Sequence, residues 1–181
     1  GDRFRGTYHE QLATEALFQR RSVEDWWASQ KFIDGTDTLK PTPYRFVEER
    51  FLEAYFAAEM PGLHVLEIGC GTGLYTRKLA RHAAAVTGLD YNPEYIRRAR
   101  EKAGDQYQNL DFIVADIIAW EPGEGAQART YDRVILIDTF LFLFAPEFQP
   151  ALVKNRDRVM TNLRRLLKPG GRLLVMDPHP L

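Results

Sequence analysis

The chain has 181 residues, a formal net charge of −1 and a hydrophobic fraction of 45%. Its length suits one well-packed domain, and its near-neutral charge gives no electrostatic reason to expect nucleic acid or a membrane as a partner. The longest apolar run, residues 140–144, is far shorter than the ~18 residues that a membrane span requires. The single cysteine, Cys70, permits no internal disulfide and favours a reducing, cytoplasmic compartment.

The first 43 residues are weakly periodic, and we expect them to form a helical segment apart from the main domain. One helix is expected at 10–18, and another begins near Ser22, whose hydroxyl can cap it. Trp26 and Trp27 follow, and they would either form part of a lid over a ligand or pack within this segment. The predicted division is therefore a lid at 1–43 and a main domain at 44–181.

From Tyr44 onward, helical and strand patterns alternate. Residues 44–60 predict an amphipathic helix, whose apolar positions near a helical period are Phe46, Val47, Phe51, Leu52, Tyr55 and Phe56. Repeated strand–helix units with apolar strands predict an α/β fold, a parallel sheet with helices on both faces. Strands are expected at 63–68, 85–90, 110–115, 131–137 and 172–176, helices at 74–82, 93–102 and 150–167, and a loop or poor helix at 120–129.

A glycine-rich loop, Gly-Cys-Gly-Thr-Gly at residues 69–73, follows the first strand and precedes a helix. Glycine at every second position lets a polar ligand approach the backbone closely. A dinucleotide-binding loop would place its third glycine one residue later, where this chain has Leu74, and would favour an apolar residue at Glu67. Both departures disfavour a nicotinamide-dependent oxidoreductase, which stays an alternative.

Acidic residues follow the later strands, at the edge of the sheet where ligands bind in such folds. Asp90 is placed to accept hydrogen bonds from the hydroxyls of a ribose, or else to cap the next helix, a role that Asn92 already offers. Asp116 would accept from an adenine amino group, with Ile117 packing on the ring, or would cap a turn. Tyr91 would stack on the same ring or shield it.

Four segments resemble, in order, the motifs of the class I S-adenosylmethionine-dependent methyltransferases, which have a Rossmann-like fold. They are the glycine motif at 65–73, the acidic motif at 88–90, the adenine-contacting motif at 114–117 and the turn into the fifth strand at 166–175.

This resemblance implies S-adenosylmethionine as the cofactor and S-adenosylhomocysteine as the product. In the family, the glycine loop holds the amino-acid end of the cofactor, and the residue matching Glu67 supports the loop. The acids matching Asp90 and Asp116 bind the ribose and the adenine. The predicted cofactor site consists of Glu67, Gly69, Cys70, Gly71, Gly73, Asp90, Tyr91, Asp116, Ile117 and Asp138.

The acceptor is expected to be a small molecule that is methylated on oxygen or nitrogen. The turn after the fourth strand lacks the Asn/Asp-Pro-Pro-aromatic sequence of enzymes that methylate amino groups of nucleic acids. A base is needed only if the acceptor carries a proton that must leave, and His179, Asp138 and Tyr44 are the candidates. Residues 140–144 would either wall an apolar acceptor pocket or pack the following helix.

Two further alternatives stay open. Asp138 and Asp177, at the ends of adjacent strands, would share a divalent cation if the chain were a catechol-type O-methyltransferase; Pro178 departs from that pattern, and no metal is expected. The chain would otherwise be a module that binds the cofactor without catalysis. The family's sheet normally has two more strands, so we expect this sequence to be C-terminally incomplete. The sequence does not indicate the oligomeric state.

Overall fold

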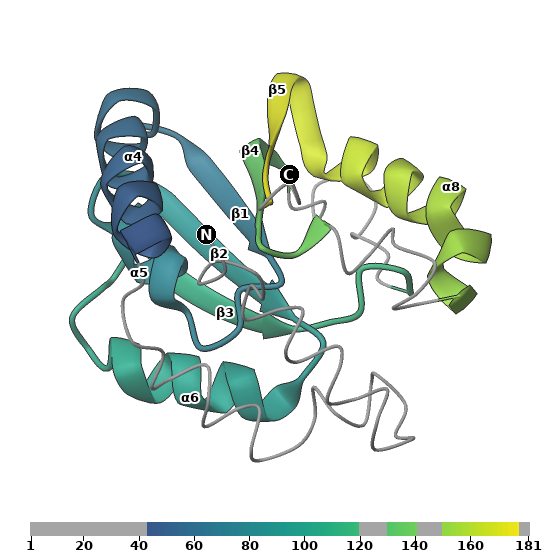
Figure 1. The fold of residues 1–181 in the computed structure, drawn as a ribbon, viewed down its shortest axis with the longest axis horizontal. Helices are drawn as coiled ribbons and strands as arrows, with labels where there is room; N and C mark the ends of the chain where they lie inside the picture. The colour runs from purple at the N-terminus through teal and green to yellow at the C-terminus, as the bar shows by residue number, and fades with distance from the viewer. Residues whose placement is uncertain (1–42, 120–129, 141–149, 178–181) are drawn as a thin grey trace, which may run out of the picture.

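The computed structural model describes residues 43–119, 130–140 and 150–177 (Figure 1). The helices expected at 10–18 and after Ser22, nearly all of the lid segment 1–43, and the loop at 120–129 lie outside the described residues. They stay predictions. No helix in the described part of the chain is long and apolar enough to cross a membrane.

Five parallel strands form one sheet in the order β3-β2-β1-β4-β5. The chain moves outward from β1 to β2 and β3, then returns past β1 to add β4 and β5. The strand order therefore reverses between β1 and β4, where the carboxyl ends of the strands border the ligand crevice of doubly wound folds. The strands are β1 (His64–Ile68), β2 (Ala85–Asp90), β3 (Leu110–Val114), β4 (Tyr131–Ile137) and β5 (Leu167–Met176).

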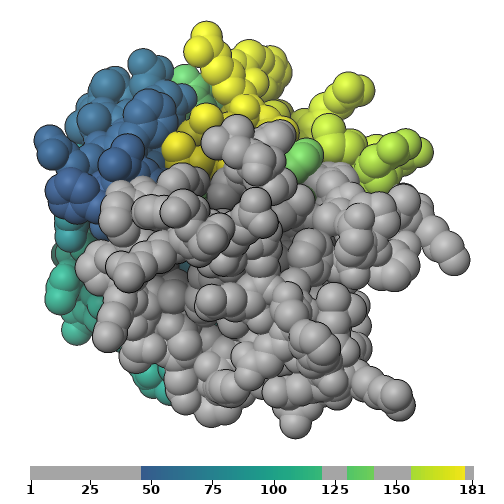
Figure 2. All heavy atoms as spheres, in the orientation of Figure 1, coloured from purple at the N-terminus to yellow at the C-terminus, as the bar shows by residue number. Residues whose placement is uncertain are grey.

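Helices cover both faces of this sheet, so the expected α/β fold is confirmed (Figure 1). Side chains alternate along β1, and for this reason Val65 packs with α4 and α5 while Leu66 packs with α8. The space-filling view shows α4 on one side of the molecule and β5 with α8 on the other (Figure 2). The helices are α4 (Pro43–Glu59), α5 (Leu74–Ala80) and α6 (Pro93–Ala103) on one face, and α8 (Pro150–Leu166) on the other.

The buried side of α4 is narrower than the expected apolar face: Leu52, Tyr55 and Phe56 pack in the core as expected, but three other expected positions do not. Leu52 and Phe56 are buried against the sheet, whereas Phe46, Val47 and Phe51 are 58, 66 and 59% exposed. At about 100° of rotation per residue, positions 46, 47 and 51 all lie roughly 100° or more around the helix from Leu52. The predicted apolar face is therefore wrong at those three positions, because hydrophobic residues surround much of this helix and the pattern alone does not select the packed side.

The fifth strand begins earlier than expected, at Leu167 instead of residue 172. Leu167 already pairs with Tyr131 of β4, and the ladder resumes at Arg172 after a register shift. Residues 168–171 therefore bulge from the strand and do not separate it from α8. The Pro-Gly-Gly sequence at this point signals a turn, but it does not reveal that one strand pair forms before the turn.

Asn162 links α8 by hydrogen bonds to the turn that follows β3. Its side chain is 3% exposed, and its Nδ2 donates hydrogen bonds to the carbonyl oxygens of Ile117 at 2.8 Å and Ile118 at 3.4 Å. This contact joins two segments that are far apart in the sequence on the face that α8 covers.

Replacement of Asn162 tests this link. Asn162→Ala should lower the free energy of unfolding by about 1–3 kcal/mol, because the buried carbonyl of Ile117 loses its donor. Urea unfolding followed by circular dichroism measures the change. Arg164→Ala, at an exposed position of the same helix, is the control and should change the free energy by less than ~0.5 kcal/mol. Equal losses in the two variants would contradict the assignment.

Candidate functional site

The glycine loop at 69–73 leaves β1 at the carboxyl edge of the sheet and leads into α5. Gly69 N and Cys70 N both donate to Leu89 O of β2, at 2.8 and 3.0 Å. Gly73 N donates to Cys70 O at 2.9 Å and closes a turn within the loop. The amides of Gly69 and Cys70 thus hold the loop against β2, the amide of Gly73 is used within the loop, and none of the three is available to a ligand.

Gly73 fits the loop against β3 and α6. A Cβ atom at this position would lie 2.9 Å from Phe112 Cζ and 3.1 Å from Ala99 Cβ, and the residue has a φ of +76°. A side chain here would therefore be both crowded and strained. Gly73 performs the close packing that the third glycine performs in a dinucleotide-binding loop, although it comes one residue earlier in the chain.

Cys70 is the second residue of the loop, and its side chain packs in the small buried cluster between α6 and β3. Its side chain is 6% exposed, and a Cβ atom at Gly88 would lie 3.0 Å from its Sγ. Burial raises the pKa of the thiol well above its usual value, and the nearby carboxyls of Asp90 and Glu67 add to the rise.

Asp90, at the end of β2, ties the glycine loop to the start of α6. Its Oδ2 accepts a 2.9 Å hydrogen bond from Gly71 N, and its Oδ1 accepts one of the same length from Asn92 N. The helix cap is Asn92, whose Oδ1 accepts from Glu94 N at 2.9 Å. The alternative in which Asp90 caps α6 is therefore wrong, and its carboxylate instead organises two backbone segments at the carboxyl edge of the sheet.

The Asp90 carboxyl is 5% exposed. Burial raises its pKa to about 6, while the backbone N–H groups of Asn92, Gly71 and Tyr91 act in the opposite direction because they stabilise the carboxylate. The group is therefore mostly ionised at neutral pH and becomes protonated in mild acid.

Glu67 lies in β1 just before the loop and is 2% exposed. Thr76 Oγ1 of α5 donates a 2.5 Å hydrogen bond to Glu67 Oε2, so this pair links the two elements that the loop connects. Burial is the main cause of a pKa of about 8 for the Glu67 carboxyl; the Asp90 charge raises it further, whereas the Thr76 hydrogen bond and the Arg77 charge lower it. Glu67 is therefore largely protonated at neutral pH.

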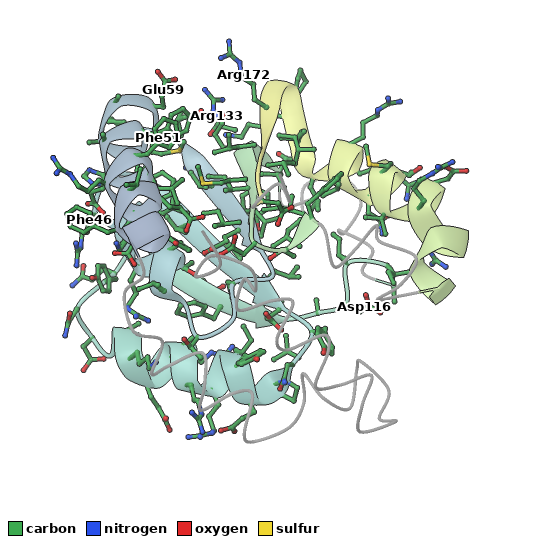
Figure 3. All side chains as sticks on the ribbon, in the orientation of Figure 1. Phe46, Phe51, Glu59, Asp116, Arg133 and Arg172 are labelled. Atoms are coloured by element: carbon green, nitrogen blue, oxygen red, sulfur yellow. The ribbon has the colours of Figure 1, made fainter. Side chains whose placement is uncertain are left out.

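The residues predicted to lie near an adenine ring differ in accessibility. Asp116 follows β3 and is exposed, as Figure 3 shows, and its Oδ1 accepts a 2.9 Å hydrogen bond from Ile118 N. The turn-capping alternative thus accounts for one oxygen of this carboxyl. Tyr91 is 44% exposed, whereas Ile117 is 5% exposed and packs in the core with α8. Little of the Ile117 side chain is therefore accessible to a ring.

The turn after β4 carries one of the three predicted bases. Asp138 has a φ of +52°, the single non-glycine residue with a positive φ among the described residues, and its N donates to Met176 O of β5 at 2.8 Å. Tyr44 lies in the first turn of α4, with its side chain outside the described part, and His179 lies outside it altogether. Only Asp138 is thereby placed at the carboxyl edge with the glycine loop and Asp90.

The metal alternative finds no additional ligands in the described ranges. Within residues 43–119, 130–140 and 150–177, no group of three or more His, Cys, Asp or Glu side chains could hold a metal ion. Phe140 packs against the core on the α8 side, which agrees with the packing alternative at that position; residues 141–144 lie outside the described residues.

Sequence reasoning missed three residues that shape this site. Thr76 binds Glu67, Phe112 packs on Gly73, and Thr139 lies against Gly69. Thr139 directly follows Asp138 after β4, so the expectation that ligands bind at strand ends applied to Thr139 as well. The carboxylate of Asp138 was the stronger signal. The contacts of Thr76 and Phe112 join separate elements and leave no local pattern.

Comparison with known proteins places the chain among methyltransferases. The sequence model of the family described as "Methyltransferase domain" matches residues 59–180. The chain is 28% identical over 151 residues to the ubiquinone biosynthesis O-methyltransferase of Coxiella burnetii (strain Dugway 5J108-111), covering 83% of this chain and 56% of that protein. It is 32% identical over 120 residues to the demethylmenaquinone methyltransferase of Tropheryma whipplei (strain Twist), covering 66% and 44%. The chain thus spans about half the length of these relatives.

Solved structures share the fold. The N-methyltransferase NodS from Bradyrhizobium japonicum WM9, in complex with S-adenosyl-L-homocysteine, superposes with a TM-score of 0.62 at 21% identity over 84% of this chain and 69% of that one. The DhpI-SAM-HEP complex superposes with a TM-score of 0.60 at 25% identity over 92% and 66%.

The raised pKa of Glu67 predicts a pH-dependent stability. The folded protein favours the protonated carboxyl, so this contribution is full below pH ~4.5 and is lost as the pH rises towards about 8. The free energy of unfolding should therefore fall by roughly 1–3 kcal/mol between pH 5 and pH 8, as measured by urea unfolding. Glu67→Gln should flatten this slope, whereas Glu59→Gln, at an exposed position, should leave it unchanged. An unaltered slope in Glu67→Gln would refute the assignment.

Packing at Gly73 makes a second prediction. Gly73→Ala should lower the free energy of unfolding by about 2–3 kcal/mol, because the new methyl group meets Phe112 and the backbone is strained. Gly62→Ala is the matched control, since Gly62 has a φ of +78° but a Cβ there would meet nothing within 4 Å. It should cost about 1 kcal/mol, from backbone strain alone. Thermal and urea unfolding measure both; equal losses would show that crowding is not the cause.

Proposed function

The chain belongs to the class I S-adenosylmethionine-dependent methyltransferases, and on that premise we propose that it transfers a methyl group from S-adenosylmethionine to a small-molecule acceptor, on oxygen or nitrogen. The observation that carries the proposal is the contact between Asp90 and Gly71. It brings an acid and an open glycine backbone together where the strand order reverses, and such crevices bind nucleotide ligands.

The Asp90 carboxylate is the proposed ribose partner. Each of its oxygens accepts one backbone hydrogen bond, and a carboxylate oxygen can accept a second. Both ribose hydroxyls therefore find acceptors on a group that the protein already holds in place. With a pKa of about 6, the carboxyl is mostly ionised at neutral pH, as this role requires.

The glycine loop is the proposed site for the amino-acid end of the cofactor. A Cβ atom at Gly71 would meet nothing within 4 Å, so the loop is open there, while Gly69 and Gly73 pack inward. The buried side chains of Glu67 and Cys70 support the loop from the protein interior. At the other end, Asp116 and Tyr91 are exposed and would contact the adenine, while the small accessible part of Ile117 would meet the ring.

Bound S-adenosylmethionine would supply a methyl group on a cationic sulfonium. The bond from sulfur to this methyl breaks as a bond to the acceptor oxygen or nitrogen forms, and any proton on that atom must leave. The chain's contribution is mainly to position the acceptor in line and to exclude water. Asp138 is the first candidate base because it lies at the carboxyl edge; His179 and Tyr44 are the others.

The curated relatives guide the choice of acceptors. One is named as an O-methyltransferase of ubiquinone biosynthesis and the other as a demethylmenaquinone methyltransferase, so phenols and hydroquinones come first in a panel, followed by amines. Residues 1–43 are the proposed lid over the acceptor. We place the chain in the cytoplasm, free of nucleic acid and membrane; cell fractionation that found it elsewhere would contradict this.

Titration with S-adenosylhomocysteine tests the proposal directly. Isothermal titration calorimetry should show binding to the intact chain, and Asp90→Asn should weaken it by at least about tenfold, because an amide nitrogen replaces one acceptor and the charge is lost. Asp105→Asn, at an exposed position after α6, is the control and should bind as the unaltered chain does.

Three outcomes would change the conclusion. If the unaltered chain does not bind S-adenosylhomocysteine, the proposed function is wrong, and fluorescence quenching by a reduced nicotinamide cofactor would favour an oxidoreductase. Binding without methyl transfer to any acceptor would indicate a non-catalytic module. Activity that is lost on chelation and restored by a divalent cation would favour the metal-dependent alternative through Asp138 and Asp177.

A further inference from the structure

Thr139, in the turn after β4, packs directly against the first residue of the glycine loop. A Cβ atom at Gly69 would lie 2.4 Å from Thr139 Cγ2 and 2.5 Å from Thr139 Oγ1, closer than real atoms approach. The threonine side chain therefore occupies the space next to Gly69. Because β1 and β4 pair in register, with Ile68 opposite Leu136, the two turns leave the sheet side by side.

Hydrogen bonds fix the Thr139 side chain in that place. Its Oγ1 donates a hydrogen bond to Ile137 O at 2.9 Å and a longer one to Gly69 O at 3.4 Å. On the far side, Asp138 N donates to Met176 O of β5. The turn is thus held to β5 by its backbone and to the glycine loop by the shape of one side chain.

Gly69 itself has a φ of +71°, and its amide is bound to β2. Since β2 anchors the loop on one side, Thr139 is the contact that limits its position on the other. Removal of the Thr139 methyl and hydroxyl would leave room for the loop to shift towards β4. A shift of a fraction of an ångström is enough to weaken a ligand that a site must hold closely.

We propose that Thr139 is a positioning residue: its side chain holds the glycine loop in the position that the amino-acid end of S-adenosylmethionine requires. The same contact couples this loop to the turn that carries Asp138. The inference rests on the proposed function. It predicts that Thr139 matters for the amino-acid end of the ligand and not for the nucleoside end, which Asp90 and Asp116 would bind.

Two ligands separate these ends. S-adenosylhomocysteine carries the amino-acid portion, and 5′-methylthioadenosine is the same nucleoside without it. Thr139→Ala should weaken S-adenosylhomocysteine by about tenfold but 5′-methylthioadenosine by less than about twofold. Thr139→Val keeps the β-branched shape that packs against Gly69 but lacks the hydroxyl, and it should hold S-adenosylhomocysteine within about threefold of the unaltered chain. Calorimetry measures the affinities, and thermal unfolding is recorded for each variant.

Thr161→Ala is the matched control, since Thr161 Oγ1 also donates to a backbone carbonyl, that of Asp157, but at an exposed position on α8. It should bind both ligands as the unaltered chain does. Equal weakening of both ligands in Thr139→Ala would indicate a merely structural role and overturn the proposal, as would unchanged affinities or a loss in Thr139→Val as large as that in Thr139→Ala. If the unaltered chain binds neither ligand, the proposed function fails as well.

Discussion

The hydrogen bond from Gly71 N to Asp90 Oδ2 is the contact on which the geometry of the site depends. It joins the loop after β1 to the end of β2. The second oxygen of the same carboxylate accepts a hydrogen bond from Asn92 N, where the backbone leads into α6. Burial of a carboxylate is costly unless hydrogen bonds satisfy it, and here the backbone N–H groups of Gly71 and Asn92 do so. One side chain thus orders two backbone segments and still presents acceptor capacity at the edge of the sheet.

Around this contact, the loop is confined on several sides by close backbone packing. Gly73 rests on Phe112 and Ala99, and Gly69 rests on Thr139, so the two outer glycines serve packing while Gly71 remains open. The buried pair of Glu67 and Thr76 fixes the strand before the loop to the helix after it. The loop is therefore held in one shape by its neighbours before any ligand arrives, which reduces the ordering cost of binding.

Much of this architecture was predictable because its signals are local. Apolar strands that alternate with helices predicted the parallel sheet, and the glycine spacing with Asp90 at the next strand end predicted that the loop and this carboxyl lie together. The errors have a common cause, which is packing between distant segments. The sequence around Phe46 and Phe51 does not tell which side of α4 meets the sheet, and Leu167 pairs with Tyr131 before the expected turn. Likewise, Thr139 and Phe112 gain their roles only when other strands bring them to the loop.

The burial of Cys70 also bears on the redox behaviour of the protein. A thiol reacts with oxidants and electrophiles as the thiolate, and burial beside two carboxyls raises the pKa of this one well above its usual value. The chain's one sulfhydryl group is therefore expected to react slowly in the folded protein, although it belongs to the glycine loop itself. We therefore expect oxidants and electrophiles to modify this buried thiol slowly as long as the loop keeps its folded shape.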